Sequence, residues 1–420
     1  MNRLSKKFWF SMILFGMMGQ IAWVVENMYF NVFIYNMFNA TAKDISTMVM
    51  ASAVMAALTT IIMGAISDKV GKRKAFMSWG YIIWGISIIT FAYIKSVTLT
   101  IVMDCVMTFF GSTANDAAYN AWLTDKGDKT NRGLIEGYNS MMPLIAILIV
   151  FGGFMSFNLD KMSSWKAIYY IIGFLTIVIG IIGLFIIEDI SDIKKEERIL
   201  LETIAYSFKL KTFKNNKPLY YVLLAFALFG ISIQIFMPYL IIYYEKTLML
   251  DNYVLIMAPA IIVAAIVTAL YGKVYDSLGF YSSIIAPLSM LAVGYILLYI
   301  FTNTLLVFIG SMFMMAGYLC GVSVFGAKIR DLIPENRAGQ FQGIRILGQV
   351  FIPGLIGPFI GSSVLRNAEQ ILNNDGTYSF LPNKNIWLAS LITIFVLGIA
   401  IGLIKDRIAD KTIGDIIDEY

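Results

Sequence analysis

The chain has 420 residues, of which 59% are hydrophobic and 14% are charged, and its mean hydropathy is +0.75. Soluble proteins carry about 25% charged residues, so this composition excludes an ordinary soluble fold and predicts an integral membrane protein. The chain contains no histidine, which removes the commonest zinc ligand and the usual proton shuttle at neutral pH. We therefore expect no enzymatic activity, no cofactor and no bound metal.

Twelve apolar stretches are each long enough to cross a bilayer as a helix, which takes about 20 residues. The first six cover residues 8–35, 45–66, 75–94, 97–123, 134–157 and 165–187. The other six cover residues 219–243, 253–271, 281–301, 304–327, 341–364 and 386–404. We therefore predict an all-α integral membrane protein with 12 transmembrane helices.

The polar segment 188–218 divides these stretches into two groups of six. We predict an N-terminal half at residues 1–187, a linker at 188–218 and a C-terminal half at 219–420. Lysine and arginine concentrate on the linker and on the other segments that share its side of the membrane, and cytoplasmic loops retain positive charge during insertion. The linker and both termini are therefore expected in the cytoplasm. This loop bias also accounts for the net charge of +5, so no nucleic-acid partner is implied.

Two loops at equivalent places in the halves carry the same residue pattern. A glycine, an aspartate and a second glycine recur 208 residues later, as Gly64, Asp68 and Gly71, then Gly272, Asp276 and Gly279. A looser echo places Arg132 ahead of the fifth stretch and Arg337 ahead of the eleventh. Such an internal repeat predicts two pseudo-symmetric halves of six helices.

This arrangement resembles the major facilitator superfamily in its two groups of six spans, its long central loop and its Gly-x-x-x-Asp-x-x-Gly-Lys-Arg segment after span two. The resemblance implies the major facilitator fold, with Asp68 accepting hydrogen bonds from the start of span eleven in a latch that closes the cytoplasmic side. The residues expected to gate are Gly64, Asp68, Gly71, Arg73, Asp125, Arg132, Asp276 and Arg337. Arg73 is equally explained as a topology determinant, and Asp125 with Arg132 as a loop ion pair.

A closer resemblance is to the glycoside, pentoside and hexuronide cation symporters. It rests on the segments Asn-Asp-Ala-Ala-Tyr-Asn-Ala-Trp-Leu-Thr-Asp at 115–125 and Arg-Asp-Leu-Ile-Pro-Glu-Asn-Arg at 330–337. Span two contains no carboxylate in its interior, so the paired-aspartate sodium site of melibiose-type members is not reproduced. We expect a co-transported proton, with sodium as the alternative.

Polar side chains inside the apolar spans are the strongest pointers to function, because each costs free energy in lipid unless it faces a cavity or a partner. Amides beside aromatic faces suit a neutral polyhydroxylated solute such as a sugar or glycoside. The expected solute-binding residues are Gln20, Trp23, Asn27, Asn31, Asn115, Tyr119, Asn120, Gln234 and Tyr318. The alternative for these amides is that they join neighbouring helices by hydrogen bonds to backbone.

Glu26 in span one is the carboxylate that we expect to couple transport to a proton, with Asp104 and Asp116 in span four as rivals. The leading hypothesis is a monomeric secondary active transporter that moves a sugar-like solute with a proton by alternating access. Its setting would be the inner or plasma membrane of a prokaryote, with the solute and the lipid bilayer as partners. The alternatives are a proton-coupled exporter of drugs or metabolites, and a sensor or membrane enzyme without flux.

Overall fold

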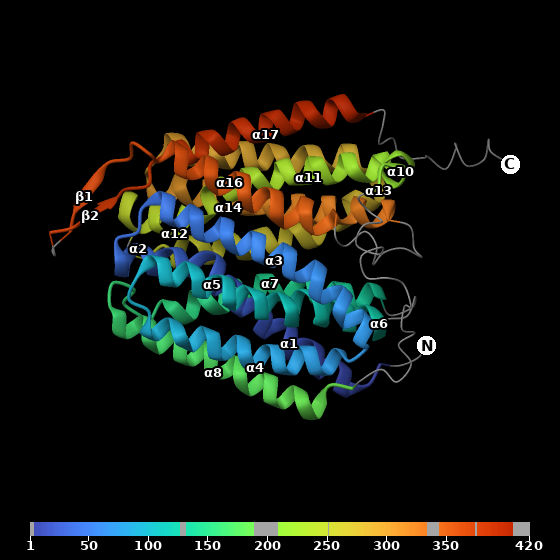
Figure 1. The fold of residues 1–420 in the computed structure, drawn as a ribbon. Helices are drawn as coiled ribbons and strands as arrows, with labels where there is room; N and C mark the ends of the chain where they lie inside the picture. The colour runs from blue at the N-terminus through green and yellow to red at the C-terminus, as the bar shows by residue number, and fades with distance from the viewer. Residues whose placement is uncertain are drawn as a thin grey trace. The chain divides into compact units, whose positions relative to one another are not determined.

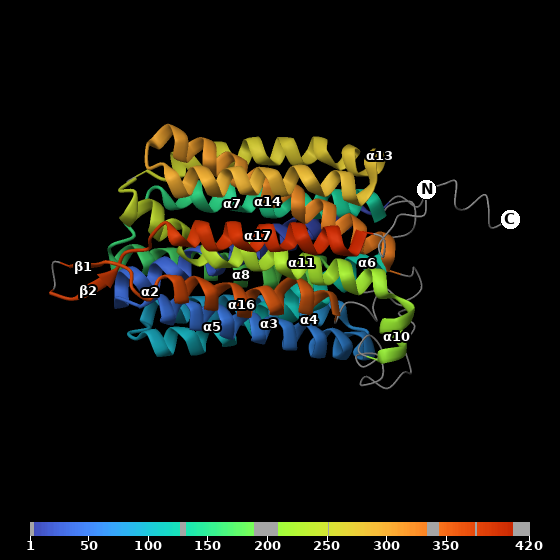
Figure 2. The ribbon, with the colours of Figure 1, turned by 90° about the horizontal axis from the view of Figure 1, so that it is seen from above.

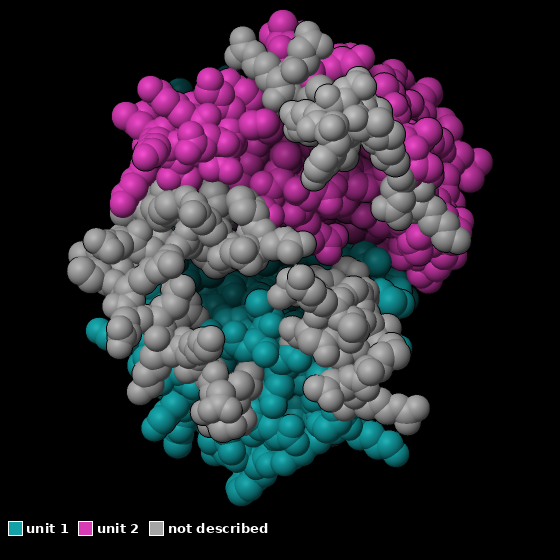
Figure 3. Space-filling view, turned by 90° about the vertical axis from the view of Figure 1, so that its right-hand side faces the viewer, with its two compact units in different colours: residues 1–205, 237–254, 358–383 teal, residues 206–236, 255–357, 384–420 magenta. Residues whose placement is uncertain are grey.

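The computed structural model describes residues 4–126, 132–188, 209–250, 252–333, 344–373 and 376–405. Long helices make up most of this part of the chain (Figures 1 and 2). It folds as two compact units, which Figure 3 colours separately. Unit 1 comprises Met1–Ala205, Met237–Val254 and Pro358–Asn383, and unit 2 comprises Tyr206–Phe236, Leu255–Gly357 and Lys384–Tyr420.

Unit 1 contains the whole predicted N-terminal half and also two segments of the predicted C-terminal half. The division into residues 1–187, 188–218 and 219–420 stays a prediction. Most of the predicted linker, residues 189–208, lies outside the described residues.

In the described ranges, 11 helices are long and apolar enough to cross a membrane. They correspond to every predicted span except the fifth. That span lies in α7 (Arg132–Phe154), where the apolar stretch found among the described residues is Met141–Phe154. The prediction of an all-α membrane protein is therefore confirmed.

Two spans of unit 1 are continuous helices that each contain a π-helical turn. The first runs through α1 (Lys6–Val24), η1 (Val25–Tyr29) and α2 (Phe30–Phe38). The second runs through α5 (Val97–Gly111), η3 (Ser112–Tyr119) and α6 (Asn120–Lys126). Serine side chains cap both N-termini by accepting hydrogen bonds from backbone N–H groups that have no partner inside the helix, as Ser5 does from Phe8.

The other helices of unit 1 are α3 (Ala42–Val70), α4 (Arg73–Thr90), η2 (Phe91–Tyr93), α7 and α8 (Met162–Ile186). Helix α3 begins with a capping box formed by Thr41 and Asp44. Helix α4 packs along α8 (Figure 1), and glycines allow the two backbones to meet. A Cβ atom on Gly85 would lie 2.5 Å from the backbone oxygen of Gly173, so a larger residue would force these helices apart.

Two later segments of the chain complete unit 1. They form η4 (Met237–Tyr239), α12 (Leu240–Ile242), η5 (Tyr243–Thr247) and an antiparallel hairpin of β1 (Gln370–Leu372) and β2 (Tyr378–Phe380). The sequence pattern did not predict this hairpin. It is attached to the end of span one, where the Tyr35 hydroxyl donates to the backbone oxygen of Phe380 over 2.7 Å. The Tyr239 hydroxyl likewise donates to the backbone oxygen of Ala42 over 2.9 Å.

Unit 2 is built mainly from α10 (Leu210–Asn215), α11 (Lys217–Phe236), α13 (Val254–Ile300), α14 (Thr304–Leu332), η7 (Leu347–Phe351), α16 (Ile352–Val364) and α17 (Asn385–Ile404). Helix α13 consists of two helices joined at Gly279, which has φ 69° and ψ −177°. Its repeat partner Gly71 ends α3 with the same φ of 69°. Both loops of the internal repeat thus turn at a glycine in a backbone conformation that other residues rarely adopt.

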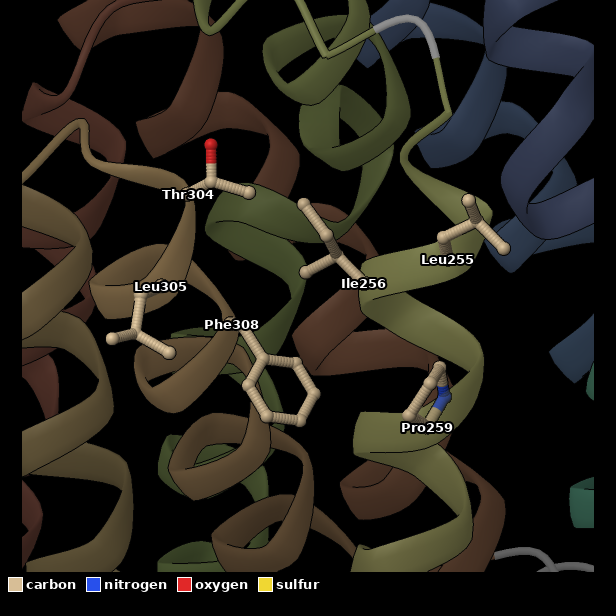
Figure 4. Close-up of a pocket in the computed structure, with 6 residues that line it drawn as sticks. All are labelled: Leu255, Ile256, Pro259, Thr304, Leu305 and Phe308. Carbon is tan, nitrogen blue, oxygen red and sulfur yellow. The ribbon is translucent and has the colours of Figure 1, made fainter.

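The core of unit 2 includes the interface between α11 and α17. The ring centroids of Phe236 and Trp387 are 4.9 Å apart, and the Ser232 hydroxyl donates to the backbone oxygen of Ser390 over 3.0 Å. An apolar pocket of about 540 Å³ lies between the beginnings of α13 and α14 (Figure 4), lined by Leu255, Ile256, Pro259, Thr304, Leu305 and Phe308. Thr304 is the one polar residue of that lining, so the pocket offers little to a polar solute.

Candidate functional site

Two π-helical turns of unit 1, η1 and η3, coincide with the polar segments of spans one and four. Turn η1 contains Glu26 and Asn27, and turn η3 contains Asn115 and Asp116. In a π turn the backbone bonds run from residue i to i+5, which leaves a carbonyl oxygen without its usual partner and rotates the residues that follow. Such turns occur frequently at functional sites, so both helices carry their polar residues where the backbone is irregular.

Glu26 and Thr108 join these two spans. Glu26 is 6% exposed, and the Thr108 hydroxyl lies 2.8 Å from its Oε1 atom. The same hydroxyl lies 2.8 Å from the backbone oxygen of Asp104, one turn earlier in α5. Asp104 is 2% exposed, and its side chain interacts electrostatically with Glu26. The structure therefore brings together two of the three carboxylates that were expected to couple transport to an ion.

Several polar atoms around this pair have no hydrogen-bond partner in the described part of the chain. On the carboxylates these atoms are Oε2 of Glu26 and Oδ1 of Asp104. The hydroxyl of Tyr169 in α8, which interacts electrostatically with Asp104, is another. Buried polar groups of this kind commonly bind ordered water.

The third carboxylate, Asp116, is partly exposed and faces Trp23, Ser112 and Asn115. It also acts electrostatically on Glu26.

Three of the predicted asparagines bond to backbone oxygens of their own helices at the π turns. The side-chain amide of Asn27 donates to the oxygen of Trp23 over 2.8 Å, and that of Asn31 donates to the oxygen of Asn27 over 2.9 Å. In span four, Asn120 donates to the oxygens of Asn115 and Asp116, over 3.2 and 3.1 Å. These amides satisfy backbone oxygens in and beside the π turns, which gives them a local structural role.

Asn115 and Tyr119 are 2% exposed, and each contacts neighbouring helices. The Tyr81 hydroxyl of α4 lies 3.1 Å from Oδ1 of Asn115, and the Tyr119 hydroxyl donates to the backbone oxygen of Met12 over 3.0 Å. Gly19 allows this packing, because a Cβ atom there would lie 2.4 Å from Oδ1 of Asn115. Both side chains thus hold span four against its neighbours in unit 1.

The remaining predicted solute residues of unit 1 reach its accessible surface. Asn27 and Asn120 are exposed, and Gln20 and Trp23 are partly exposed. The Trp23 ring packs on Trp84 with 5.0 Å between ring centroids. Spans one and four therefore carry an accessible group of three amide side chains and one indole, and of these Trp23 and Asn120 lie close to Asp116.

Gln234 and Tyr318, the predicted solute residues of the second half, both lie in unit 2. Gln234 is partly exposed on α11, where it packs against Gly357, and Tyr318 is partly exposed on α14.

Asp125, a predicted gating residue, forms an ion pair with Arg73. The Arg73 Nε atom donates to Oδ2 of Asp125 over 2.9 Å, and Nη1 donates to the Ser67 hydroxyl over 2.7 Å. Gly64 makes only ordinary contact, with Ala117. The side chains of Asp68, Arg132 and Asp276, and all of Arg337, lie outside the described residues. The latch between Asp68 and span eleven therefore stays a prediction.

Sequence reasoning did not single out the aromatic residues of α4 and α8 that pack against spans one and four, namely Tyr81, Trp84 and Tyr169. All three are fully buried. Their positions in ordinary apolar spans give no sign of these contacts. Thr108 carried a weak signal, because it shares one helical face with Asp104.

Comparison with known proteins identifies the class of protein that this architecture represents. A family model described as the Major Facilitator Superfamily matches residues 8–362. The chain therefore belongs to the major facilitator superfamily and is a secondary transporter with multiple membrane spans.

Individual relatives share this architecture at low sequence identity. An uncharacterized transporter of the major facilitator type from Methanocaldococcus jannaschii is 24% identical over 347 residues, which cover 81% of this chain and 86% of that protein. A mutant of the nucleoside transporter NupG superposes with a TM-score of 0.74 at 14% identity, covering 94% of this chain and 99% of that one. A bacterial homolog of the human lysosomal transporter Spinster, inward-facing and occupied, gives a TM-score of 0.72 at 14% identity, covering 96% and 97%. These two structural likenesses establish the fold.

Proposed function

We propose that the protein moves a small neutral polar solute together with a proton by alternating access. The main observation that supports this proposal is the buried position of Glu26. Its carboxylate lies within an apolar span, it is 6% exposed, and one of its oxygens has no partner among the described residues. A permanent charge there is costly, whereas a carboxylate that takes up and releases a proton can couple ion movement to a change of conformation.

The accessible group on spans one and four supports a solute with many hydroxyl groups. Asn27 and Asn120 use their Nδ2 atoms to bond backbone oxygens, so what they offer to a solute is the amide oxygen. Gln20 offers a further amide at the accessible surface, and the Trp23 indole offers an aromatic face. A sugar or glycoside matches these groups and agrees with the resemblance of residues 115–125 to sugar symporters. NupG is described as a nucleoside transporter, and a nucleoside is itself an N-glycoside, so nucleosides belong in the test panel.

Symport by a monomer in the plasma membrane of a prokaryote is the simplest form of this proposal. Proton movement in sealed proteoliposomes tests it, as monosaccharides, disaccharides, glycosides, uronic acids, nucleosides and lipophilic cations are added in turn. External alkalinisation on addition of one sugar or glycoside class would support proton symport of that class. Proton movement driven by lipophilic cations alone would replace it with the exporter. Solute accumulation that requires sodium and moves no proton would show that the coupled ion is sodium and not a proton.

Two variants complete this experiment. Glu26→Gln should abolish uphill transport but retain solute exchange, because glutamine mimics the protonated carboxyl group and cannot release a proton. Asp160→Asn is the matched control: this carboxylate pairs with Lys246 over 2.9 Å, and its side chain is 66% exposed. Full proton-driven accumulation by Glu26→Gln would refute the role of Glu26.

A further inference from the structure

The Thr108 hydroxyl lies between two oxygen atoms and cannot donate to both. It is 2.8 Å from Oε1 of Glu26 and 2.8 Å from the backbone oxygen of Asp104, and a hydroxyl carries one proton. When Glu26 is protonated, its O–H group can donate to Thr108, which then donates to the Asp104 backbone oxygen. When Glu26 is ionised, Thr108 must turn its proton to Glu26. The oxygen to which Thr108 donates therefore differs between the protonated and the ionised state of Glu26.

No described residue donates a hydrogen bond to the Asp104 side chain. Its Oδ1 atom has no hydrogen-bond partner among the described residues, and Asp104 is 2% exposed. The described titratable groups that interact electrostatically with the pair include Asp116, Tyr169 and Cys105, none of which carries positive charge. Two ionised carboxylates side by side in apolar surroundings would repel each other without compensation.

Tyr169 in α8 is a buried titratable residue that interacts electrostatically with Asp104. Its hydroxyl has no hydrogen-bond partner in the described part of the chain, so it does not donate to Asp104. Surrounding aromatic rings hold the Tyr169 ring in place, namely Phe30, Phe33, Phe91 and Trp165. With its ring held in this way, Tyr169 supplies no hydrogen bond that would stabilise a charge on Asp104.

We propose that the two carboxylates have different, fixed roles: Glu26 alone releases the transported proton, Asp104 keeps its proton throughout the cycle, and Thr108 stabilises ionised Glu26. The assignment follows from the donors, because the Thr108 hydroxyl can stabilise a charge on Glu26 and nothing described does so for Asp104. In the release step the O–H bond of Glu26 breaks, its electron pair stays on the carboxylate, and the proton leaves to water. Thr108 then turns from the Asp104 oxygen to Glu26.

This inference rests on the proposed proton coupling and predicts one proton per solute. Asp104→Asn should retain coupled uphill transport at that stoichiometry, because asparagine resembles a permanently protonated aspartic acid. Loss of coupling in Asp104→Asn, with solute exchange retained, would overturn the inference, since Asp104 would then release a proton itself. A ratio of two protons in the unmodified protein would also overturn it. Failure of the proposed function looks different, because the unmodified protein would then move no proton.

Thr108 provides an independent test that does not depend on replacing a carboxylate. Thr108→Val removes the donor to ionised Glu26, so proton release should need a pH higher by about one to two units. Thr108→Ser should restore the original pH profile. Thr113→Val is the matched control, because Thr113 bonds to the backbone oxygen of Phe109 over 2.7 Å in the same way but has no hydrogen bond to a carboxylate among the described residues. An unchanged pH profile in Thr108→Val, or an equal shift in Thr113→Val, would overturn the role of Thr108.

Discussion

Asn39 donates a hydrogen bond from its Nδ2 atom to the hydroxyl of Thr377 over 2.8 Å, although 338 residues separate the two in the sequence. Asn39 ends α2 in the left-handed conformation, with φ 51°, which asparagine tolerates better than most residues. Its Oδ1 atom also accepts from Asn373 over 3.1 Å and from Ser379 over 3.2 Å. One side chain therefore both ends span one and holds the hairpin of β1 and β2 within unit 1.

Replacement of Asn39 by alanine should loosen the hairpin without unfolding the protein. The change removes three hydrogen bonds, each worth about 1 kcal/mol net, and water can replace part of them because the site is only partly buried. We expect amide hydrogen exchange in β1 and β2 to become about ten- to a hundredfold faster, while exchange in the helices of unit 1 stays unchanged. Ser363→Ala, whose hydroxyl bonds only within its helix, is the control. Unchanged exchange in the hairpin of Asn39→Ala would show that Asn39 does not hold it.

The ion pair of Arg73 and Asp125 supports a second prediction. The Arg73 side chain is 5% exposed and that of Asp125 is 25% exposed, so solvent screens this pair less than a surface pair. A double-mutant cycle of Arg73→Gln and Asp125→Asn should give a coupling energy of about 1–3 kcal/mol in detergent unfolding experiments. The same cycle on Lys246 and Asp160, whose side chains are 28% and 66% exposed, should give less than about 1 kcal/mol. Equal coupling in both cycles would contradict the interpretation that burial strengthens the first pair.

Hydropathy was sufficient to predict most of the fold. A span of about 20 apolar residues is a local property, and so is the Gly-x-x-x-Asp-x-x-Gly repeat, whose closing glycines Gly71 and Gly279 both have φ 69°. The hairpin and the pairing of Arg73 with Asp125 were not predicted. Both depend on contacts between residues distant in the sequence, and neither segment has a composition that specifies its partner.

The candidate site was predictable in its residue types but not in its geometry. Gln20, Asn27 and Asn31 were predicted together as solute-binding residues, and a regular helix of 3.6 residues per turn would place them on one face of span one. Turn η1 breaks that period, so Asn27 is exposed whereas Asn31 is fully buried. Glu26 was recognisable because a carboxylate in an apolar span is costly wherever it points, whereas the direction of an amide depends on the exact winding of the helix.

The two repeat glycines should tolerate substitution differently, although they share φ 69°. Gly71 has ψ 17°, which is left-handed helical, and Gly279 has ψ −177°, a region that is essentially restricted to glycine. Gly71→Asn should therefore cost less than about 1 kcal/mol in the free energy of unfolding, because asparagine often adopts the left-handed conformation at the end of a helix. Gly279→Asn should cost about 1–3 kcal/mol. Thermal unfolding in detergent measures both.

Gly398→Ala in α17 is the control for these two substitutions, because a Cβ atom there meets nothing within 4 Å and the backbone is helical. Alanine also has the higher helix propensity, so this variant should be as stable as the unmodified protein or slightly more stable. Equal losses in Gly71→Asn and Gly279→Asn would mean that the two loops turn in the same conformation. In that case the repeat would be more symmetric than the ψ values of 17° and −177° indicate.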